Sequence, residues 1–267
     1  MMEYALTLAK MATYYRNSAH YLLQADQDFI KVDTLLGREL SLHFTGDTFC
    51  KACGQRFAKL YRMGFCQNCF FTRPEAGESI IRPELSTAHL DREDRDLAFE
   101  KAYQLQPHVV YLANSGGLKV GVTRSRQKMH RWLDQGASEA IVLAETENRY
   151  LAGQMEVALK AHVGDKTPWQ KMLKNEIPDL DLRQEKRRLS EMVPEDLKKY
   201  LVEEEEVFHF EYPVNRYPQK VKSSNLLKQP DWKGILEGIK GQYLILSDGQ
   251  VLNVRSHAGF RVVFGFS

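Results

Sequence analysis

Four cysteines supply the clearest metal-binding chemistry in this sequence of 267 residues. They form two Cys-x-x-Cys pairs, Cys50 with Cys53 and Cys66 with Cys69, separated by twelve residues. Each pair lets one tight turn point two sulfurs at a common centre, and two pairs complete a tetrahedral thiolate site suited to zinc. Four thiolates leave no open position for water, so we expect a structural zinc ion rather than a catalytic one.

Two disulfides, or four unligated thiols, are the alternatives for these cysteines. The N-terminus lacks a basic segment followed by an apolar one, so no secretory signal is expected. A cytoplasmic location is then the default, and persistent disulfides are rare in reducing compartments. The sequence therefore favours zinc.

Basic and aromatic side chains lie between the two cysteine pairs, at Arg56, Lys59, Tyr61 and Arg62. Such side chains on a zinc ribbon can contact phosphates and bases of a nucleic acid. Alternatively, these side chains only keep the surface of a small zinc-binding segment hydrated, since such a segment has little hydrophobic core. The sequence leaves both interpretations open.

A second group of candidate residues lies within residues 108–163. The pattern there predicts two strands joined by a turn, a helix, a third strand and a second helix. Tyr111 falls on the first strand, and period-2 alternation places Lys119 and Gly121 on one face of the second. Arg131 falls on the first helix, and Glu156 falls at the edge of the apolar side of the second helix, where a carboxylate can face a cleft.

Basic residues are concentrated in the middle of this stretch, although the whole chain is nearly neutral. Within thirteen positions the sequence places five cations, namely Lys119, Arg124, Arg126, Lys128 and Arg131. A local basic strip of this kind is suited to binding a polyanion.

The order of these elements resembles that of the GIY-YIG nuclease domain. Residues 109–111 resemble the GIY motif with Tyr111 as its tyrosine, and residues 119–121 resemble YIG with Lys119 replacing the tyrosine. Arg131 stands at the position of the family's first-helix arginine, and Glu156 at that of its metal-binding glutamate. The resemblance implies that Glu156 holds Mg²⁺ or Mn²⁺, that Arg131 contacts the scissile phosphate and that Tyr111 orients or activates water.

Lys119 departs from that pattern. It can act as a base only if burial or nearby cations lower its pKa, and is otherwise a point charge for phosphate. Each candidate also has a structural explanation. Tyr111 can be a core residue, Gly121 can allow close backbone packing, and Arg131 and Glu156 can pair with each other or with Lys160.

More closely, nearly the whole chain resembles an uncharacterised bacterial family, the domain of unknown function 2797. The resemblance rests on five stretches, at residues 49–54, 110–113, 119–124, 131–137 and 165–167. It indicates kinship and implies no substrate.

Composition limits the other classes of function. With 37 basic and 35 acidic residues the formal charge is +2, so any nucleic-acid binding must come from a local patch. No apolar run approaches the roughly 20 residues of a membrane span. The sequence contains no P-loop and no GxGxxG motif, so neither a nucleotide nor a dinucleotide cofactor is expected.

The fold class that follows is α+β, with a central ββαβα domain of GIY-YIG type flanked by β-rich segments. The expected parts are an N-terminal β unit (1–49), a zinc ribbon (50–87), a helical connector (88–107), the central domain (108–182), a charged helical linker (183–206) and a C-terminal β-rich unit (207–267). The last unit can be completed by the N-terminal strands.

Local patterns add detail to two of these parts. In the central domain, the second helix is expected to end at Gly164, with a turn at residues 165–167 and then a short helix in which Trp169 and Met172 close the core. In the C-terminal unit, Asp248-Gly249 predicts a hairpin between the strands on either side.

Three hypotheses on function follow. The first is a metal-dependent nuclease acting on DNA or structured RNA, and the second a non-catalytic nucleic-acid-binding protein that uses the same fold to recognise phosphate. A protein–protein adaptor built on zinc and β modules is the third, and it predicts no polyanion binding.

Overall fold

The computed structural model describes residues 2–25, 28–163 and 169–267. It combines helices with three β-sheets, which confirms the α+β class. The chain divides into two compact units: unit 1 comprises residues 1–71, 133–136 and 211–267, and unit 2 comprises residues 72–132 and 137–210. Over the described part of the chain, no helix combines the length and the apolar character that crossing a membrane requires.

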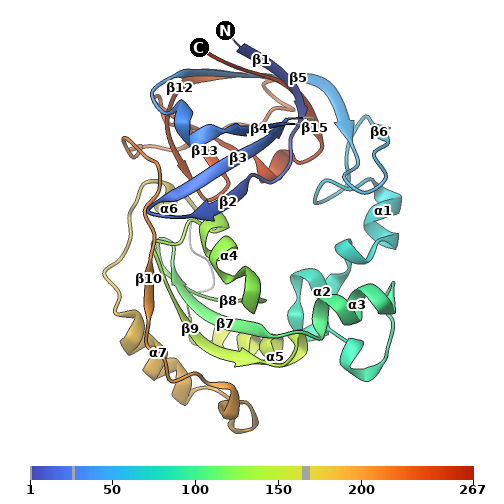
Figure 1. Cartoon of the computed structure of the whole chain (residues 1–267), viewed down its shortest axis with the longest axis vertical. Helices are drawn as coiled ribbons and strands as arrows, with labels where there is room; N and C mark the ends of the chain where they lie inside the picture. The colour runs from blue at the N-terminus through green and yellow to red at the C-terminus, as the bar shows by residue number, and fades with distance from the viewer. Residues whose placement is uncertain (1, 26–27, 164–168) are drawn as a thin grey trace. The chain divides into compact units, whose positions relative to one another are not determined.

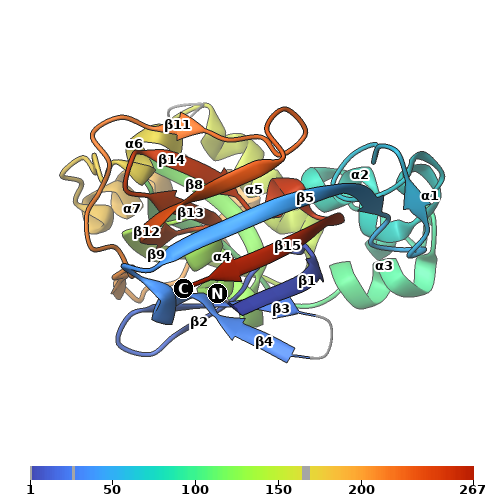
Figure 2. The ribbon, with the colours of Figure 1, turned by 90° about the horizontal axis from the view of Figure 1, so that it is seen from above.

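An eight-stranded sheet in unit 1 takes strands from both ends of the chain (Figures 1 and 2). Its order is β1 (Met2–Thr7), β15 (Phe260–Phe266), β5 (Glu39–Phe49), β12 (Asp231–Lys240), β13 (Tyr243–Leu246), β14 (Gln250–Asn253) and β11 (Lys222–Ser223), with β6 (Arg56–Phe57) paired to β5. Because β1 and β15 pair along their length, the N-terminal and C-terminal β segments expected from the sequence share one sheet. A smaller sheet contains β2 (Ala12–Tyr15), β3 (Ala19–Ala25) and β4 (Asp28–Lys31).

Local patterns account for the strands of unit 1. In β5, Leu40, Leu42 and Phe44 are buried and alternate with more exposed residues, as expected for a strand with one face on a core. The predicted hairpin between β13 and β14 forms at Asp248-Gly249, where Gly249 adopts a φ of +82°. That left-handed conformation suits glycine because it has no Cβ.

A four-stranded sheet forms the centre of unit 2, in the order β10 (Val207–His209), β9 (Glu139–Thr146), β7 (His108–Asn114) and β8 (Leu118–Arg124). Strands β7 and β8 form the predicted hairpin, α4 (Lys128–Asp134) leads to β9, and α5 (Arg149–Lys160) follows. The predicted order of two strands, helix, strand and helix is therefore present. Strand β8 is an edge strand of this sheet.

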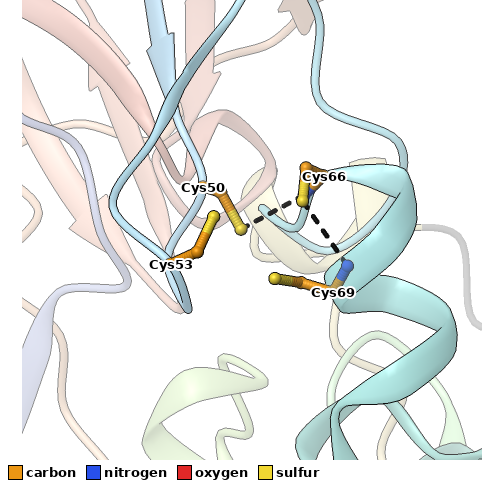
Figure 3. A group of neighbouring side chains, drawn as sticks. All are labelled: Cys50, Cys53, Cys66 and Cys69. Atoms are coloured by element: carbon orange, nitrogen blue, oxygen red, sulfur yellow. Dashed lines mark hydrogen bonds between the residues drawn. The ribbon is translucent and has the colours of Figure 1, made fainter.

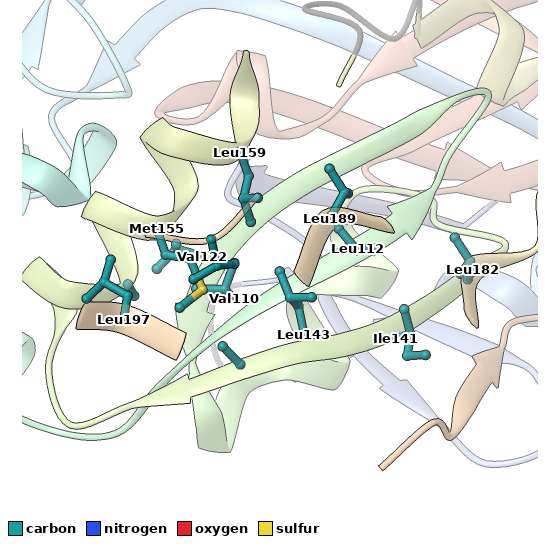
Figure 4. Packing of buried hydrophobic residues seen from close by; sticks show 13 residues of the cluster. Val110, Leu112, Val122, Ile141, Leu143, Met155, Leu159, Leu182, Leu189 and Leu197 are labelled. Atoms are coloured by element: carbon teal, nitrogen blue, oxygen red, sulfur yellow. The ribbon is translucent and has the colours of Figure 1, made fainter. Parts of the chain in front are cut away.

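One face of this sheet packs against α5 and α7 (Leu182–Glu191), as Figure 4 shows. Val110 and Leu112 of β7 and Met155 and Leu159 of α5 are fully buried in this cluster. Tyr111 belongs to the opposite face, where its ring meets Trp132 of α4. The alternation of β7 therefore separates an aliphatic face under α5 from an aromatic face under α4.

The expected helical connector over residues 88–107 is interrupted. It contains a short 3₁₀ helix, η4 (Ala88–Leu90), and then α3 (Leu97–Gln104), which is N-capped by Asp96. The carboxylate of Glu100 accepts hydrogen bonds from the backbone N–H groups of Asp94, Arg95 and Asp96, at 2.7 to 3.1 Å. These bonds hold residues 94–96 in a loop, which is why the helix cannot extend further toward the N-terminus.

The expected charged helical linker is shorter than predicted. Helix α7 ends at Glu191, a 3₁₀ helix η6 (Glu195–Tyr200) follows Pro194, and residues 202–206 are not helical. Glu205 accepts two hydrogen bonds from Arg187 of α7, at 2.7 and 2.8 Å. These bonds hold residue 205 beside α7 instead of in a continuing helix.

The remaining helices are α1 (Gln67–Thr72), α2 (Glu78–Ile81) and α6 (Trp169–Leu173). The predicted helix end at Gly164 and the turn at Asp165, Lys166 and Thr167 lie outside the described residues. In α6, Met172 is buried as predicted.

Candidate functional site

The four cysteines converge on one point (Figure 3). Cys50 follows the end of β5, and its turn is closed by the bond from Gly54 N to the carbonyl of Cys50, at 2.8 Å. Cys66 precedes α1 and Cys69 lies in its first turn. The Cys66 N–H donates to Cys50 Sγ at 3.2 Å, which ties the two pairs together.

The geometry of the four sulfurs fits a tetrahedral metal site. All four Sγ atoms lie within 4.8 Å of one another, and none is in a disulfide. Zinc–sulfur bonds of about 2.3 Å place tetrahedral sulfurs about 3.8 Å apart, so a small closure completes the site. The cysteines therefore form a group able to hold a metal ion such as zinc.

The thiols of this group differ in acidity. Burial disfavours the Cys50 thiolate, but hydrogen bonds from the backbone N–H groups of Cys53, Cys66 and Ala52 outweigh burial and lower its pKa to about 6. Desolvation and the neighbouring sulfurs raise the pKa of Cys69 to about 12. Sulfurs this close cannot all ionise without a cation between them, which is the condition that zinc relieves.

The basic candidates of the zinc ribbon lie on the surface of unit 1. Arg56 is exposed and forms an ion pair with Asp47. Arg62 is exposed, with its guanidinium 5.6 Å from the ring centroid of Tyr61. Both remain accessible to a phosphate group.

In unit 2, the structure places Tyr111 in the core. Its side chain is 0% exposed, and it pairs across the sheet with Gly121. The ring centroids of Tyr111 and Trp132 are 5.8 Å apart, in an edge-to-face arrangement. A water-activating role for Tyr111 stays a prediction, and its complete burial is the observation against direct contact with a substrate.

Lys119 of β8 and Arg131 of α4 interact electrostatically. Lys119 is half-buried, and its pKa is lowered by desolvation and by repulsion from the nearby Arg131 guanidinium. Two cations that repel each other while partly removed from water form an arrangement that an anion would stabilise.

Glu156 lies on the opposite side of the sheet, on α5. It is 8% exposed, and its Oε1 lies 3.4 Å from Lys160 Nζ, the pairing that the sequence offered as the structural alternative. Burial raises the pKa of Glu156; Lys160 opposes this effect, and Glu84 adds to it. The carboxylate is therefore mostly enclosed and already paired.

A buried arginine, Arg149, interacts with both Glu156 and the basic residues. Arg149, at the start of α5, interacts electrostatically with both Glu156 and Arg131, and burial is the main cause of its lowered pKa. Its guanidinium donates to the carbonyls of Ser79 and Ile80 at 2.9 and 2.8 Å, so it also holds the end of α2. Electrostatic interactions thus relate Lys119 to Arg131, and Arg149 to both Arg131 and Glu156.

Sequence reasoning missed Arg149 and Glu84. A positive charge in the first turn of a helix opposes the helix dipole, and this unfavourable placement directly after the Asn148 cap was the available signal for Arg149. Glu84 gave no signal because only the packing of the 3₁₀ helix η3 (Pro83–Leu85) against α5 brings it close.

The other basic residues of the strip continue along the same segment. Arg124 is half-buried, with its guanidinium 4.7 Å from the Tyr103 ring centroid and 2.6 Å from the side-chain oxygen of Gln127. Arg126 is exposed. Lys128 Nζ lies 5.4 Å from the ring centroid of Phe208.

The oxygen donors around Glu156 do not form a finished site for a divalent cation. Glu84 is the carboxylate close enough to affect Glu156, and it lies 3.1 Å from Arg82 Nε. Mg²⁺ and Mn²⁺ prefer several unpaired oxygen ligands. A cation already neutralises each of these two carboxylates, so the residues present do not fit such an ion.

Comparison with known proteins gives the family and no activity. No curated protein and no solved structure matches the chain. Residues 37–262 match DUF2797, described as a protein of unknown function. Since the match spans most of the chain, from β5 through the cysteine group and unit 2 into β15, the protein belongs to the DUF2797 family.

Proposed function

We propose that unit 2 binds the phosphate groups of a nucleic acid at the edge formed by β8 and the start of α4. The observation that carries this proposal is that Lys119 of β8 and Arg131 of α4, both half-buried, belong to one run of basic residues that contains no acidic residue. Repulsion from Arg131 also lowers the pKa of Lys119. A phosphate placed between them would relieve their mutual repulsion.

The surrounding charge supports the same proposal. Residues 115–133 contain no aspartate or glutamate but include Arg124, Arg126 and Lys128 besides the central pair. Arginine offers paired donors with the geometry of a phosphate, and several such contacts along one segment follow a phosphate backbone.

Metal-dependent cleavage, of the kind that the resemblance to GIY-YIG nucleases implies, is the second candidate. One observation favours it: Arg149 relates Glu156 electrostatically to Arg131, so the carboxylate and the phosphate-binding pair belong to one electrostatic group. Against it stand the burial of Tyr111 and the pairing of Glu156 with Lys160. Recognition without cleavage is therefore the preferred function.

We also propose that the four cysteines bind one structural zinc ion. Support comes from the mutual Sγ separations within 4.8 Å and from the two Cys-x-x-Cys turns that present the sulfurs. With all four positions taken by sulfur, this ion would stabilise the fold of residues 50–69 and would not activate water.

A binding and cleavage assay with matched variants tests the proposed function. Wild type, Lys119→Met with Arg131→Gln, and Glu156→Gln are titrated against single-stranded DNA, duplex DNA and transfer RNA with Mg²⁺ or Mn²⁺. Lys198→Met is the control because it removes a partly exposed lysine that pairs with Glu195 elsewhere in unit 2. The double variant should bind more weakly, and its slope of log affinity against log salt should fall by roughly two, about one per lost phosphate contact.

The possible results separate the candidates. Binding by Glu156→Gln as tight as that of wild type, with no cleavage by either protein, supports recognition alone. Cleavage by wild type that Glu156→Gln abolishes would replace recognition by the nuclease hypothesis. Equal binding by the double variant and by Lys198→Met would overturn the site on β8 and α4.

A further inference from the structure

Residues 50–71 of unit 1 form a segment of concentrated positive charge. They include Lys51, Arg56, Lys59 and Arg62 and contain no aspartate or glutamate, whereas the whole chain has a formal charge of only +2. Backbone hydrogen bonds from Lys51 N to Gly64 O and from Tyr61 N to Phe65 O, at 2.9 and 2.8 Å, hold the backbone of this segment. The charge excess therefore belongs to one defined part of the surface.

Three aromatic rings lie together on the same segment. Tyr61 lies 5.0 Å from Phe70 and 5.5 Å from Phe71, centroid to centroid, and the two phenylalanine rings are 5.3 Å apart. Tyr61 is 44% exposed and Phe71 is 55% exposed. We call these three residues the aromatic triad. Large rings clustered and left in contact with water mark a binding surface more often than they stabilise a fold.

The basic residues adjoin this triad. The Arg62 guanidinium lies 5.6 Å from the Tyr61 ring centroid. Lys59, Tyr61 and Arg62 all line one shallow hollow of about 170 Å³. A ring and two cations thus face the same space, which is the combination that a base and its flanking phosphates require.

A larger cavity of about 830 Å³ adjoins this hollow, sharing Met63, Ser256 and Ala258 with it. Its basic residues are Lys10, Lys51 and Arg255, and no described residue lining either space is acidic. Ligand cavities typically measure about 300–1,000 Å³, so this one has room for an inserted base. The ion pair with Asp134 neutralises Lys10. Lys51, whose Nζ lies 3.9 Å from the ring centroid of Phe65, and the exposed Arg255 supply the positive charge of the rim.

We propose that the aromatic triad and the two adjoining hollows bind single-stranded nucleic acid. Bases stack on Tyr61 and Phe71, and Lys59 and Arg62 hold the phosphates between them. Single strands fit this surface because the faces of unpaired bases are free to stack, whereas in a duplex they are covered by neighbouring base pairs. The absence of acidic residues from the described lining favours a polyanion over an apolar protein partner.

This inference rests on the proposed function in one respect, since it takes nucleic acid as the ligand of the protein. The inferred site uses different residues, in unit 1, and it would give the protein a preference for single strands over duplexes. The site of Lys119 and Arg131 would recognise phosphates in any strand, and the aromatic triad would select strands with unpaired bases.

Three probes of equal length test the proposal by fluorescence anisotropy on the full-length protein: an oligothymidylate, a duplex, and an abasic strand with the same phosphates. Wild type should prefer the oligothymidylate over the other two. Tyr61→Ala with Phe71→Ala should weaken oligothymidylate binding by at least about five-fold and change abasic-strand binding little, because stacking needs bases. Tyr61→Phe should bind like wild type, since it keeps the ring.

Phe29→Ala is the matched control, because Phe29 is also an exposed ring of unit 1, 58% accessible on β4. Zinc content and far-ultraviolet circular dichroism are measured on every variant. If the alanine variant loses zinc, Lys59→Gln with Arg62→Gln replaces it, and this variant should weaken binding of both single strands. Equal affinity of wild type for oligothymidylate and abasic strand would overturn stacking.

The two proposals can fail separately. If the Lys119 and Arg131 variant weakens binding while the Tyr61 and Phe71 variant binds like wild type, the aromatic surface is wrong and the proposed function stands. If only the aromatic variant weakens binding, the aromatic surface is the nucleic-acid site and the proposal for β8 and α4 is wrong.

Discussion

The hydroxyl of Tyr111 lies directly over Gly121 on the neighbouring strand. A Cβ atom built on Gly121 would stand 2.5 Å from Tyr111 Oη and 2.6 Å from Cζ, closer than real Cβ atoms come to other atoms. The glycine therefore leaves the space in which the tyrosine ring crosses from β7 onto β8. The motif that links both residues to GIY-YIG nucleases has a packing role in this structure, whatever chemistry the site performs.

Gly121→Ala is expected to destabilise the protein by about 1–3 kcal/mol, the usual cost of overpacking a core. The reason is that both Tyr111 and the sheet backbone resist displacement. Urea unfolding followed by circular dichroism measures the change. A double-mutant cycle with Tyr111→Val, which removes the ring, tests this reason. In the Tyr111→Val background, Gly121→Ala should lower the free energy of unfolding by only a small fraction of its effect in wild type. An equal loss in both backgrounds would contradict the packing role.

Removing the metal from the cysteine group should unfold residues 50–69. Elemental analysis should find one zinc per chain, and Cys53→Ala should lose it, because three thiolates and water hold zinc less tightly than four thiolates. Ala52→Ser is the control, since it changes the same turn and keeps every sulfur. A chain purified without zinc, whose melting curve does not change on chelation, would refute this assignment.

Glu100→Gln should destabilise unit 2 by about 1–3 kcal/mol, since Glu100 is 3% exposed and its carboxylate accepts three backbone N–H groups before α3. An amide cannot accept all three, because its nitrogen is a donor. Thermal unfolding measures the loss. The matched control is Glu93→Gln, whose carboxylate accepts one bond, from the exposed Leu97 N–H; equal effects of the two changes would show that the buried carboxylate has no special role.

Lys240 should make stability depend on pH. It is 0% exposed, with Nζ 5.2 and 5.3 Å from the ring centroids of Tyr212 and Tyr217, and burial lowers its pKa to about 8. The unfolded chain, with the ordinary value near 10.4, binds more protons between about pH 8 and 10, so this group makes the free energy of unfolding rise with pH in that range. The full effect approaches about 3 kcal/mol.

The variant Lys240→Met tests this dependence. It should be as stable as wild type or more so at pH 7, because it removes a buried charge while keeping the volume. Its stability should no longer rise between pH 8 and 10. Urea titrations at several pH values give the comparison, and identical pH profiles for wild type and variant would rule out Lys240 as the cause.

Short-range patterns in the sequence were enough to predict several parts of this protein. The spacing of the cysteines predicted a tetrahedral sulfur group, because two residues between ligands and a tight turn determine where the sulfurs point. Asp248-Gly249 predicted the hairpin of β13 and β14, and apolar periodicity predicted the order of β7, β8, α4, β9 and α5. Each of these features depends mainly on residues that are close together in the sequence, so it can be predicted without knowledge of the tertiary structure.

Contacts between distant segments could not be predicted in the same way. The helix predicted over residues 88–107 was too long, because the Glu100 side chain accepts hydrogen bonds from backbone N–H groups before α3 and holds those residues in a loop. Arg149 and Glu84 approach Glu156 only through tertiary packing, and the rings of Tyr61 and Phe71, ten residues apart in sequence, lie 5.5 Å apart only in the folded chain.

The sequence by itself thus determined the types of chemistry that this protein carries: a thiolate group, a basic strip and the carboxylate of Glu156. The tertiary structure decided which of these residues meet and which are accessible. It buried Tyr111, paired Glu156 with Lys160, and set Lys119 within the electrostatic influence of Arg131. The physical reason is that the burial and the electrostatic environment of a side chain depend on which distant segments pack against it. The residue type and its sequence neighbours do not specify those segments.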